Sequence, residues 1–72
     1  MHNNAILHAQ KLIESGMNRD TWSQYGFNYE LRCTSLDFYC LFAKPWGGVR
    51  YTTVAYYNKY GTGISVNYAD VA

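Results

Sequence analysis

Residues 27–34 read Phe-Asn-Tyr-Glu-Leu-Arg-Cys-Thr, with apolar and polar side chains in strict alternation. Successive side chains of a β-strand point to opposite faces of a sheet, so this period of two predicts a strand with one buried and one solvated face. Half-solvated strands are typical of antiparallel sheets. The buried face of this strand is expected to carry Phe27, Tyr29, Leu31 and Cys33.

Three further strands are expected toward the C-terminus. Residues 37–43 are apolar on both sides, as in the middle of a sheet, and residues 49–57 are rich in β-branched and aromatic side chains. Residues 64–68 form a short alternating segment. Turn-forming residues separate these strands at 35–36, 44–48 and 58–61. The order of these segments predicts a four-stranded antiparallel β-meander.

Toward the N-terminus the apolar period changes to that of a helix. Ala5, Ala9 and Ile13 lie on one stripe, with polar residues opposite, as in an amphipathic surface helix. Asn3 or Asn4 is expected to cap its start, and Gly16 to supply the left-handed residue at its end. Residues 18–24 are expected to form a connector or one extra helical turn, with Trp22 at the end of the core. The chain is therefore predicted to be a single α+β domain over residues 1–72, an N-terminal amphipathic helix packed on one face of the meander.

Turn lengths set the expected pairing between strands. A two-residue turn at 35–36 and four-residue turns at 45–48 and 58–61 place the apolar residues of neighbouring strands on one face. The expected pairs across the sheet are Cys33 with Phe38, Phe38 with Ala55, and Ala55 with Ile64.

The face away from the helix is expected to stay open. One helix is about 10 Å wide and covers only one face of a sheet whose strands lie about 4.8 Å apart. Large apolar, aromatic and arginine side chains on such a face resemble the composition of protein interfaces. A second interpretation is that cross-strand tyrosines simply stabilise the sheet. The residues expected to bind a partner are Tyr39, Leu41, Val54, Tyr56, Arg32, Arg50 and Trp46.

The length and the charge of the chain make some classes of function less favourable than others. The chain has 72 residues, 18% of them aromatic, and a formal net charge of +1. A domain of this size is marginally stable, which favours a supplement such as self-association through the open face or an edge strand. Scattered charges do not form the basic patch of a duplex nucleic-acid binder. No segment approaches the roughly 20 apolar residues of a membrane span, and no signal peptide is recognised, so no membrane association and a cytoplasmic location are expected.

Residues that could carry chemistry are dispersed. Cys33 and Cys40 are seven positions apart without a second ligand pair, so no metal or cofactor is expected, and both are interpreted as free, inward-pointing thiols. His2 is expected in a mobile terminus and His8 on the polar helix face. The carboxylates form no pair suited to general acid–base catalysis, so the chain is not expected to be an enzyme.

Two functions are compatible with these features. The first is a small non-catalytic module that occludes a surface of a larger protein; compact chains of this kind are typical of mobile genetic elements, including phage-encoded inhibitors of host defence such as anti-CRISPR proteins, which act in the host cytoplasm. The second is single-stranded nucleic-acid binding, with bases stacked on Tyr39 and Tyr56 and phosphates bound by Arg32, Arg50 and Lys44. A near-neutral chain offers few phosphate contacts, which favours the first function.

Overall fold

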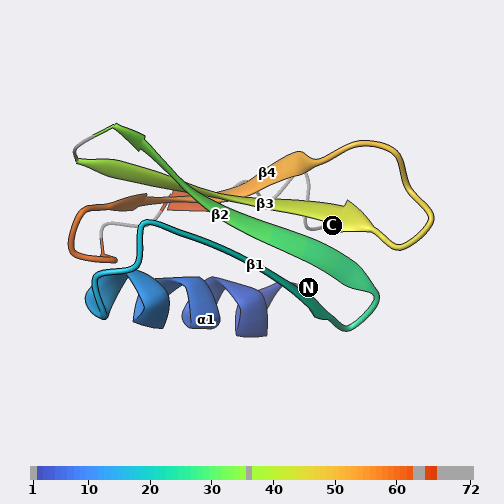
Figure 1. The fold of residues 1–72 in the computed structure, drawn as a ribbon, viewed down its shortest axis with the longest axis horizontal. Helices are drawn as coiled ribbons and strands as arrows, with labels where there is room; N and C mark the ends of the chain where they lie inside the picture. The colour runs from blue at the N-terminus through green and yellow to red at the C-terminus, as the bar shows by residue number, and fades with distance from the viewer. Residues whose placement is uncertain (1, 36, 63–64, 67–72) are drawn as a thin grey trace.

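The structure, a computed structural model, describes residues 2–35, 37–62 and 65–66. Its elements, in chain order, are α1 (Asn3–Glu14), β1 (Arg19–Gln24), β2 (Phe27–Ser35), β3 (Phe38–Pro45), β4 (Thr52–Asn58) and β5 (Ser65–Val66). The strands form one antiparallel sheet in the order β1-β2-β3-β4-β5, with α1 along one face (Figure 1). The predicted α+β class, a helix on an antiparallel meander, is confirmed. Of the predicted strand at 64–68, residues 64, 67 and 68 lie outside the described part.

The start of α1 differs from the prediction. The N-cap is His2, and no side-chain hydrogen bond caps the helix, so neither Asn3 nor Asn4 has that role. His2 is 3% exposed rather than mobile, and its Nδ1 lies 2.6 Å from the hydroxyl of Tyr29. Its ring also meets the ring of Phe27 edge-on, with centroids 4.6 Å apart. Burial of an aromatic cluster therefore positions the start of the helix.

The end of α1 is as expected. Gly16 has φ +86°, a left-handed value that favours glycine. The amide of Gly16 donates to the carbonyl of Ile13, and the amide of Met17 donates to that of Leu12, both at 3.0 Å. This pair of bonds is a Schellman motif, which satisfies carbonyls that the last turn leaves without helical partners.

The predicted helix stripe forms one side of the core. Ala5, Ala9 and Ile13 are buried against the sheet. The hydroxyl of Tyr57 on β4 donates to the carbonyl of Ile6 at 2.9 Å, which ties the helix to the middle of the meander. The buried sheet residues of this core are Tyr29, Leu31, Tyr39, Leu41, Ala43, Val54, Ala55 and Tyr57.

Residues 19–24 form strand β1, where a connector or helical turn was predicted, and the sheet therefore has a strand more than expected. β1 and β2 are joined by Tyr25 and Gly26, with φ of +50° and +86°. Two central residues with positive φ define a type I′ turn, whose twist matches that of a β-hairpin. Trp22 stacks on Tyr29 with centroids 5.6 Å apart, and His8 of α1 meets its other side at 4.5 Å. Trp22 thus packs beneath the helix.

The pairing of β2 with β3 also differs from the prediction. Cys33 pairs with Tyr39 instead of with Phe38, and Leu31 pairs with Leu41. The register shifts between Cys33 and Ser35, so one extra residue is accommodated in β2. Side chains alternate with a period of two, so a shift of one residue exchanges the two faces of the partner strand. Tyr39, Leu41 and Ala43 consequently face the helix.

A second irregularity affects β4. Leu41 pairs with Ala55 but Phe42 pairs with Thr53, which leaves Val54 as the additional residue. Ala55 and Tyr57 face the helix, as predicted for Ala55. β4 begins at Thr52 rather than at residue 49, and Ala55 pairs with Val66 of β5 rather than with residue 64. Because side chains of a strand repeat every two residues, this difference leaves Ala55 on the face predicted for it.

Candidate functional site

The candidate site is the sheet face opposite α1, called the open face below. Residues that are Cα partners in an antiparallel sheet lie side by side on one face. One such row crosses the sheet through Arg19, Arg32, Cys40 and Tyr56. The neighbouring row contains Thr21, Glu30, Phe42 and Thr53. Polar and aromatic side chains from different strands are therefore interleaved on this face.

Aromatic side chains make the open face unusually apolar for a solvated surface. Phe38 is 57% exposed and Tyr56 is 45% exposed. Phe38 pairs with Asn58, next to the row that holds Tyr56, so the two exposed rings come from adjacent strands. Clusters of exposed large apolar groups are typical of binding surfaces, whereas single exposed ones are common everywhere.

Arg32 lies in the same row as Tyr56, with Cys40 between them. Its guanidinium carbon is 5.2 Å from the centre of the Phe42 ring, a cation–π arrangement. Its Nε donates to Oε2 of Glu30, and its Nη2 donates to Oε1 at 3.3 Å. Arg19, on the adjacent strand, brings its Nη2 to 3.7 Å from the same Oε2. A carboxylate thus holds two arginines on the open face.

Glu30 is the buried member of this group. Its side chain is 9% exposed, against 55% for Arg32 and 75% for Arg19. The hydrogen bond from Arg32 holds the pKa of the Glu30 carboxyl below its ordinary value, although burial acts the other way. The same bond raises the pKa of Arg32. Glu30 is therefore ionised at neutral pH, and the two arginines are held in place by it.

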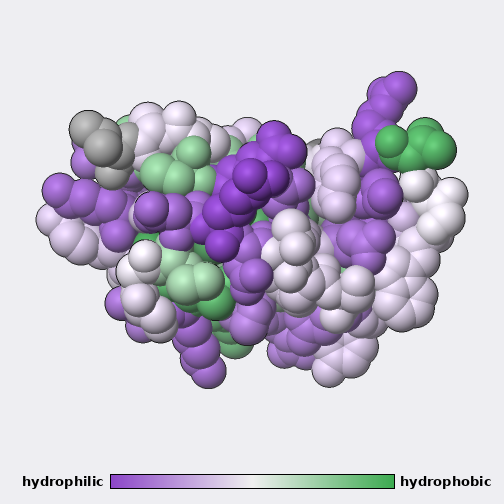
Figure 2. All heavy atoms as spheres, viewed as in Figure 1, coloured by the Kyte–Doolittle hydropathy of each residue, from purple (hydrophilic) through white to green (hydrophobic). Residues whose placement is uncertain are grey.

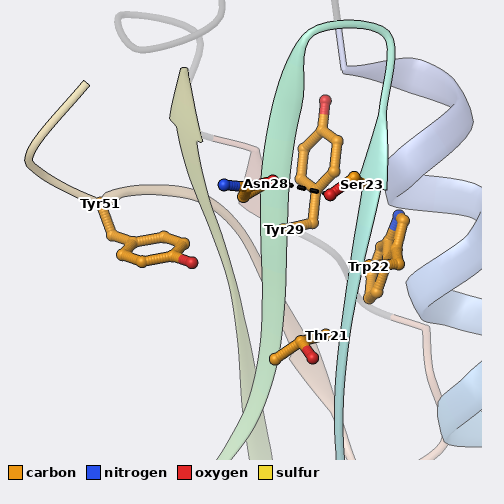
Figure 3. Close-up of a pocket in the computed structure, with 6 residues that line it drawn as sticks. All are labelled: Thr21, Trp22, Ser23, Asn28, Tyr29 and Tyr51. Atoms are coloured by element: carbon orange, nitrogen blue, oxygen red, sulfur yellow. Dashed lines mark hydrogen bonds between the residues drawn. The ribbon is translucent and has the colours of Figure 1, made fainter. Parts of the chain in front are cut away.

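The other end of the open face is more polar. Ser23 of β1 donates to the Oδ1 of Asn28 on β2 at 2.7 Å (Figure 3). The ring of Tyr51 lies beside this end and accepts a cation–π contact from Lys44 at 5.3 Å. Figure 3 shows the hydroxyl of Tyr51 directed toward β2, while Trp22 lies on the α1 side of β1. A groove of about 410 Å³ here is lined by Thr21, Trp22, Ser23, Asn28, Tyr29 and Tyr51.

A second depression lies at the arginine end. Its volume is about 390 Å³, and its lining residues are Asn18, Arg19, Arg32 and Cys33. Asn18 Oδ1 accepts a hydrogen bond from the hydroxyl of Tyr39 at 3.4 Å. The Sγ of Cys33 donates to the carbonyl of Ser35 at 2.9 Å. The two cationic side chains that line this depression are Arg19 and Arg32.

Three of the predicted partner-binding residues are not on the surface. Tyr39 is 8% exposed, and Leu41 and Val54 are 0% exposed, all within the core cluster. The predicted exposure of these three residues was wrong, because the irregularity in β2 turns Tyr39 and Leu41 toward the helix and that in β4 buries Val54. Phe38 and Phe42, which were predicted to be buried, face outward instead. The open face keeps an aromatic character with different residues.

The remaining predicted residues divide into two groups. Arg32 and Tyr56 share one row of the open face, separated by Cys40. Arg50 and Trp46 are exposed in the β3–β4 loop, at the end of β3 away from Phe38. Figure 2 shows a hydrophobic protrusion over this loop, which also holds Val49 with 97% exposure. The structure therefore brings together Arg32 and Tyr56 but not the whole predicted set.

Sequence reasoning missed Arg19, Glu30, Phe38 and Phe42 as site residues. Arg19 was assigned to a connector, and Glu30 was treated as an isolated surface charge. Spacing carried a usable signal for Glu30 and Arg32, because positions i and i+2 of a strand share a face and hold opposite charges. No local signal placed Phe38 outward.

The cysteines are free, as predicted, and Cys40 is buried. Cys33 is exposed, which corrects the expectation that both thiols point inward. Within residues 2–35, 37–62 and 65–66, no three His, Cys, Asp or Glu side chains gather in a way that would hold a metal ion. No helix in the described part of the chain is long and apolar enough to cross a membrane.

Comparison of the chain with protein-family models, curated proteins and solved structures gave no match. The functional interpretation therefore depends on the geometry of the open face.

Proposed function

We propose that the chain is a non-catalytic binding module that occludes a surface of a larger protein with its open face. The observation that carries this proposal is the exposure of Phe38 and Tyr56 on adjacent strands of the face that also presents Arg32. Aromatic and arginine side chains dominate the binding energy of protein interfaces when a partner desolvates them. Because Arg32 already stacks on Phe42, its side chain loses less conformational entropy when a partner binds.

As part of the same proposal, the larger protein is a component of a host defence system, and the chain is a phage-encoded inhibitor that acts in the host cytoplasm. The support for this assignment is the small size of the chain, 72 residues, together with a binding face on a compact scaffold.

Protein is favoured over single-stranded nucleic acid as the partner. Tyr39, one of the two rings proposed for base stacking, is buried in the core. Arg32, proposed for a phosphate, shares Glu30 with Arg19, so this group retains a single net positive charge. Phosphate contacts dominate nucleic-acid affinity, and these positions leave few cations for them.

The test uses the tagged chain as bait in a lysate of its native host. We expect the double variant Phe38→Ala/Tyr56→Ala to reduce capture of the partner at least about tenfold, because loss of interface aromatics typically costs over 1 kcal/mol each. The matched control is Tyr25→Ala/Tyr60→Ala, which removes two turn tyrosines that are 76% and 65% exposed. Circular dichroism checks that both variants fold.

Three results would contradict the proposal. The first is equal capture by the double variant and the wild type. The second is steeply salt-dependent binding of a single-stranded oligonucleotide with no protein partner. The third is a dimeric solution mass that becomes monomeric in the Phe38→Ala/Tyr56→Ala variant, since a second copy would then cover the open face.

A further inference from the structure

Arg19 and Arg32 are two cations placed directly opposite each other. They are Cα partners in the β1–β2 ladder, on the open face. Like charges in such a pair repel and destabilise a sheet. Glu30 contacts both, so the group of two arginines and one carboxylate retains a charge of +1. This residual charge lies over the ring of Phe42, on the same face as the exposed Phe38 and Tyr56.

The bonds to Glu30 leave the outer edge of the Arg32 guanidinium unoccupied. Glu30 takes the Nε and Nη2 positions. Arginine has five N–H donors, and the edge formed by Nη1 and Nη2 is a planar fork that matches the two oxygens of a carboxylate. Among the described residues, Nη1 of Arg32 donates no hydrogen bond. Glu30 binds one edge of the guanidinium and the Phe42 ring lies against it, so these two contacts fix the orientation of the guanidinium plane.

The neighbouring groups add further donors. The side chain of Arg19 is 75% exposed, and within the described part of the chain its one ion pair is the 3.7 Å contact with Glu30. Asn18 also lines the depression, and its Oδ1 accepts from Tyr39 on the α1 side of the sheet. These residues surround the depression of about 390 Å³ at the end of the open face. A site with several donors, a net positive charge and an occupied acceptor suits an anion.

We propose that this depression binds a carboxylate of the partner protein, held by the outer fork of Arg32 and by Arg19. The inference rests on the proposed function, because it assigns an acidic side chain to the partner surface that meets Phe38 and Tyr56. A carboxylate is favoured over a phosphate because one residual positive charge matches a monoanion, whereas Glu30 repels a dianion or a polyphosphate strand. Glu30 also shows that a carboxylate fits between these two arginines.

The experiment titrates the isotope-labelled chain at low salt with N-acetyl-glutamate amide, which carries one carboxylate. Side-chain NMR signals of Arg19, Arg32 and Asn18 are followed. We expect these signals to shift saturably with this compound but not with N-acetyl-glutamine amide, its neutral isostere. Inorganic phosphate and a ten-residue oligothymidylate serve as the competing anions.

Two variants distinguish the contribution of the planar guanidinium from that of its positive charge. Arg32→Lys keeps the charge but loses the planar fork, and should weaken the apparent affinity about tenfold. Arg19→Gln tests the second cation at an exposed position where the fold is retained. Lys11→Gln on α1 is the matched control for the loss of one charge and should leave the affinity unchanged.

Equal responses to the glutamate and glutamine compounds would overturn the inference. So would tighter binding of phosphate or oligothymidylate, or an unchanged affinity in both arginine variants. If the carboxylate compound does not bind while partner capture still depends on Phe38 and Tyr56, the result contradicts the carboxylate site but not the binding module. If the compound binds but capture does not depend on those aromatics, the proposed function falls instead.

Discussion

His2 shows how one buried side chain controls a helix terminus. Its Nδ1 lies 2.6 Å from the Tyr29 hydroxyl, and edge-on contacts with Phe27 and Tyr29 enclose its ring. Burial lowers the pKa of the imidazole from its ordinary value of 6.5, since desolvation penalises the charged form. Burial likewise raises the pKa of the Tyr29 hydroxyl. The folded chain therefore favours the neutral forms of both groups.

The lowered pKa of His2 predicts a pH-dependent stability. The unfolded chain binds the proton more tightly, so the free energy of unfolding is highest above pH 6.5 and decreases as the pH falls from 6.5 through the lowered folded pKa. We expect the melting temperature to drop across this range. The variant His2→Asn should lose that part of the pH dependence.

The control for this experiment is His8→Asn, which removes an exposed histidine of the same helix. The Glu30 carboxyl contributes in a separate range, because its lowered pKa affects stability only below about its ordinary value of 4.5. Identical profiles for the wild type and His2→Asn between pH 7.5 and 5 would show that His2 is not the titrating group.

At the scale of elements, the β1–β2 hairpin depends on an unusual turn residue. Tyr25 has φ +50° with its ring 76% exposed, and Gly26 follows with φ +86°. A left-handed conformation costs an ordinary L-residue about 1–2 kcal/mol, and asparagine and glycine tolerate it better. The turn was not recognised in the sequence because type I′ turns are usually marked by Asn-Gly or Asp-Gly.

We predict that Tyr25→Asn stabilises the protein by up to about 1 kcal/mol, because it relieves this conformational cost and removes few contacts. Gly26→Ala should destabilise it by about 1 kcal/mol or more. Urea unfolding monitored by tryptophan fluorescence measures both changes. Tyr60→Asn provides the comparison, because Tyr60 is a similarly exposed turn tyrosine without positive φ. Destabilisation by Tyr25→Asn would indicate that the ring contributes contacts that outweigh the backbone cost.

At the scale of the whole molecule, the register of β3 decides which residues form the core. Leu41 is 0% exposed, whereas Phe38 is 57% exposed. Leu41→Ala should lower the free energy of unfolding by about 2–5 kcal/mol, because it leaves a cavity in the core. This is a large part of the 5–15 kcal/mol typical of a folded domain. Phe38→Ala should cost less than about 1 kcal/mol.

Thermal and urea unfolding of these two variants test the register directly. The pairing predicted from turn lengths reverses the expected order, since it buries Phe38 and exposes Leu41. A larger loss of stability from Phe38→Ala than from Leu41→Ala would therefore contradict the observed pairing and, with it, the open face.

Much of the fold was predictable because it depends on local periodicity. The stripe of Ala5, Ala9 and Ile13 and the alternation of Tyr29 and Leu31 each report burial within one element. Residues 19–24 lacked such a signal, because Trp22 is the only large apolar side chain among them. β1 forms as a strand since it pairs with β2 and packs Trp22 under the helix, and both contacts are tertiary.

The candidate site was predictable only in its type. Aromatic and arginine residues were expected on the face away from the helix, and Arg32 and Tyr56 lie there. Tyr39 and Leu41 were predicted on this face, but Phe38 and Phe42 occupy it. Both sides of residues 38–42 are apolar, so the local pattern does not distinguish one side from the other.

The amino-acid sequence by itself determined the helix, the meander and the presence of an aromatic face, since the spacing of apolar residues along each segment sets which side is buried. The tertiary structure decided which aromatics occupy that face. The shift between Cys33 and Ser35 adds one residue to β2. Such an insertion leaves the local pattern unchanged, but it reverses the face of the next strand, because the side chains of a strand repeat every two residues.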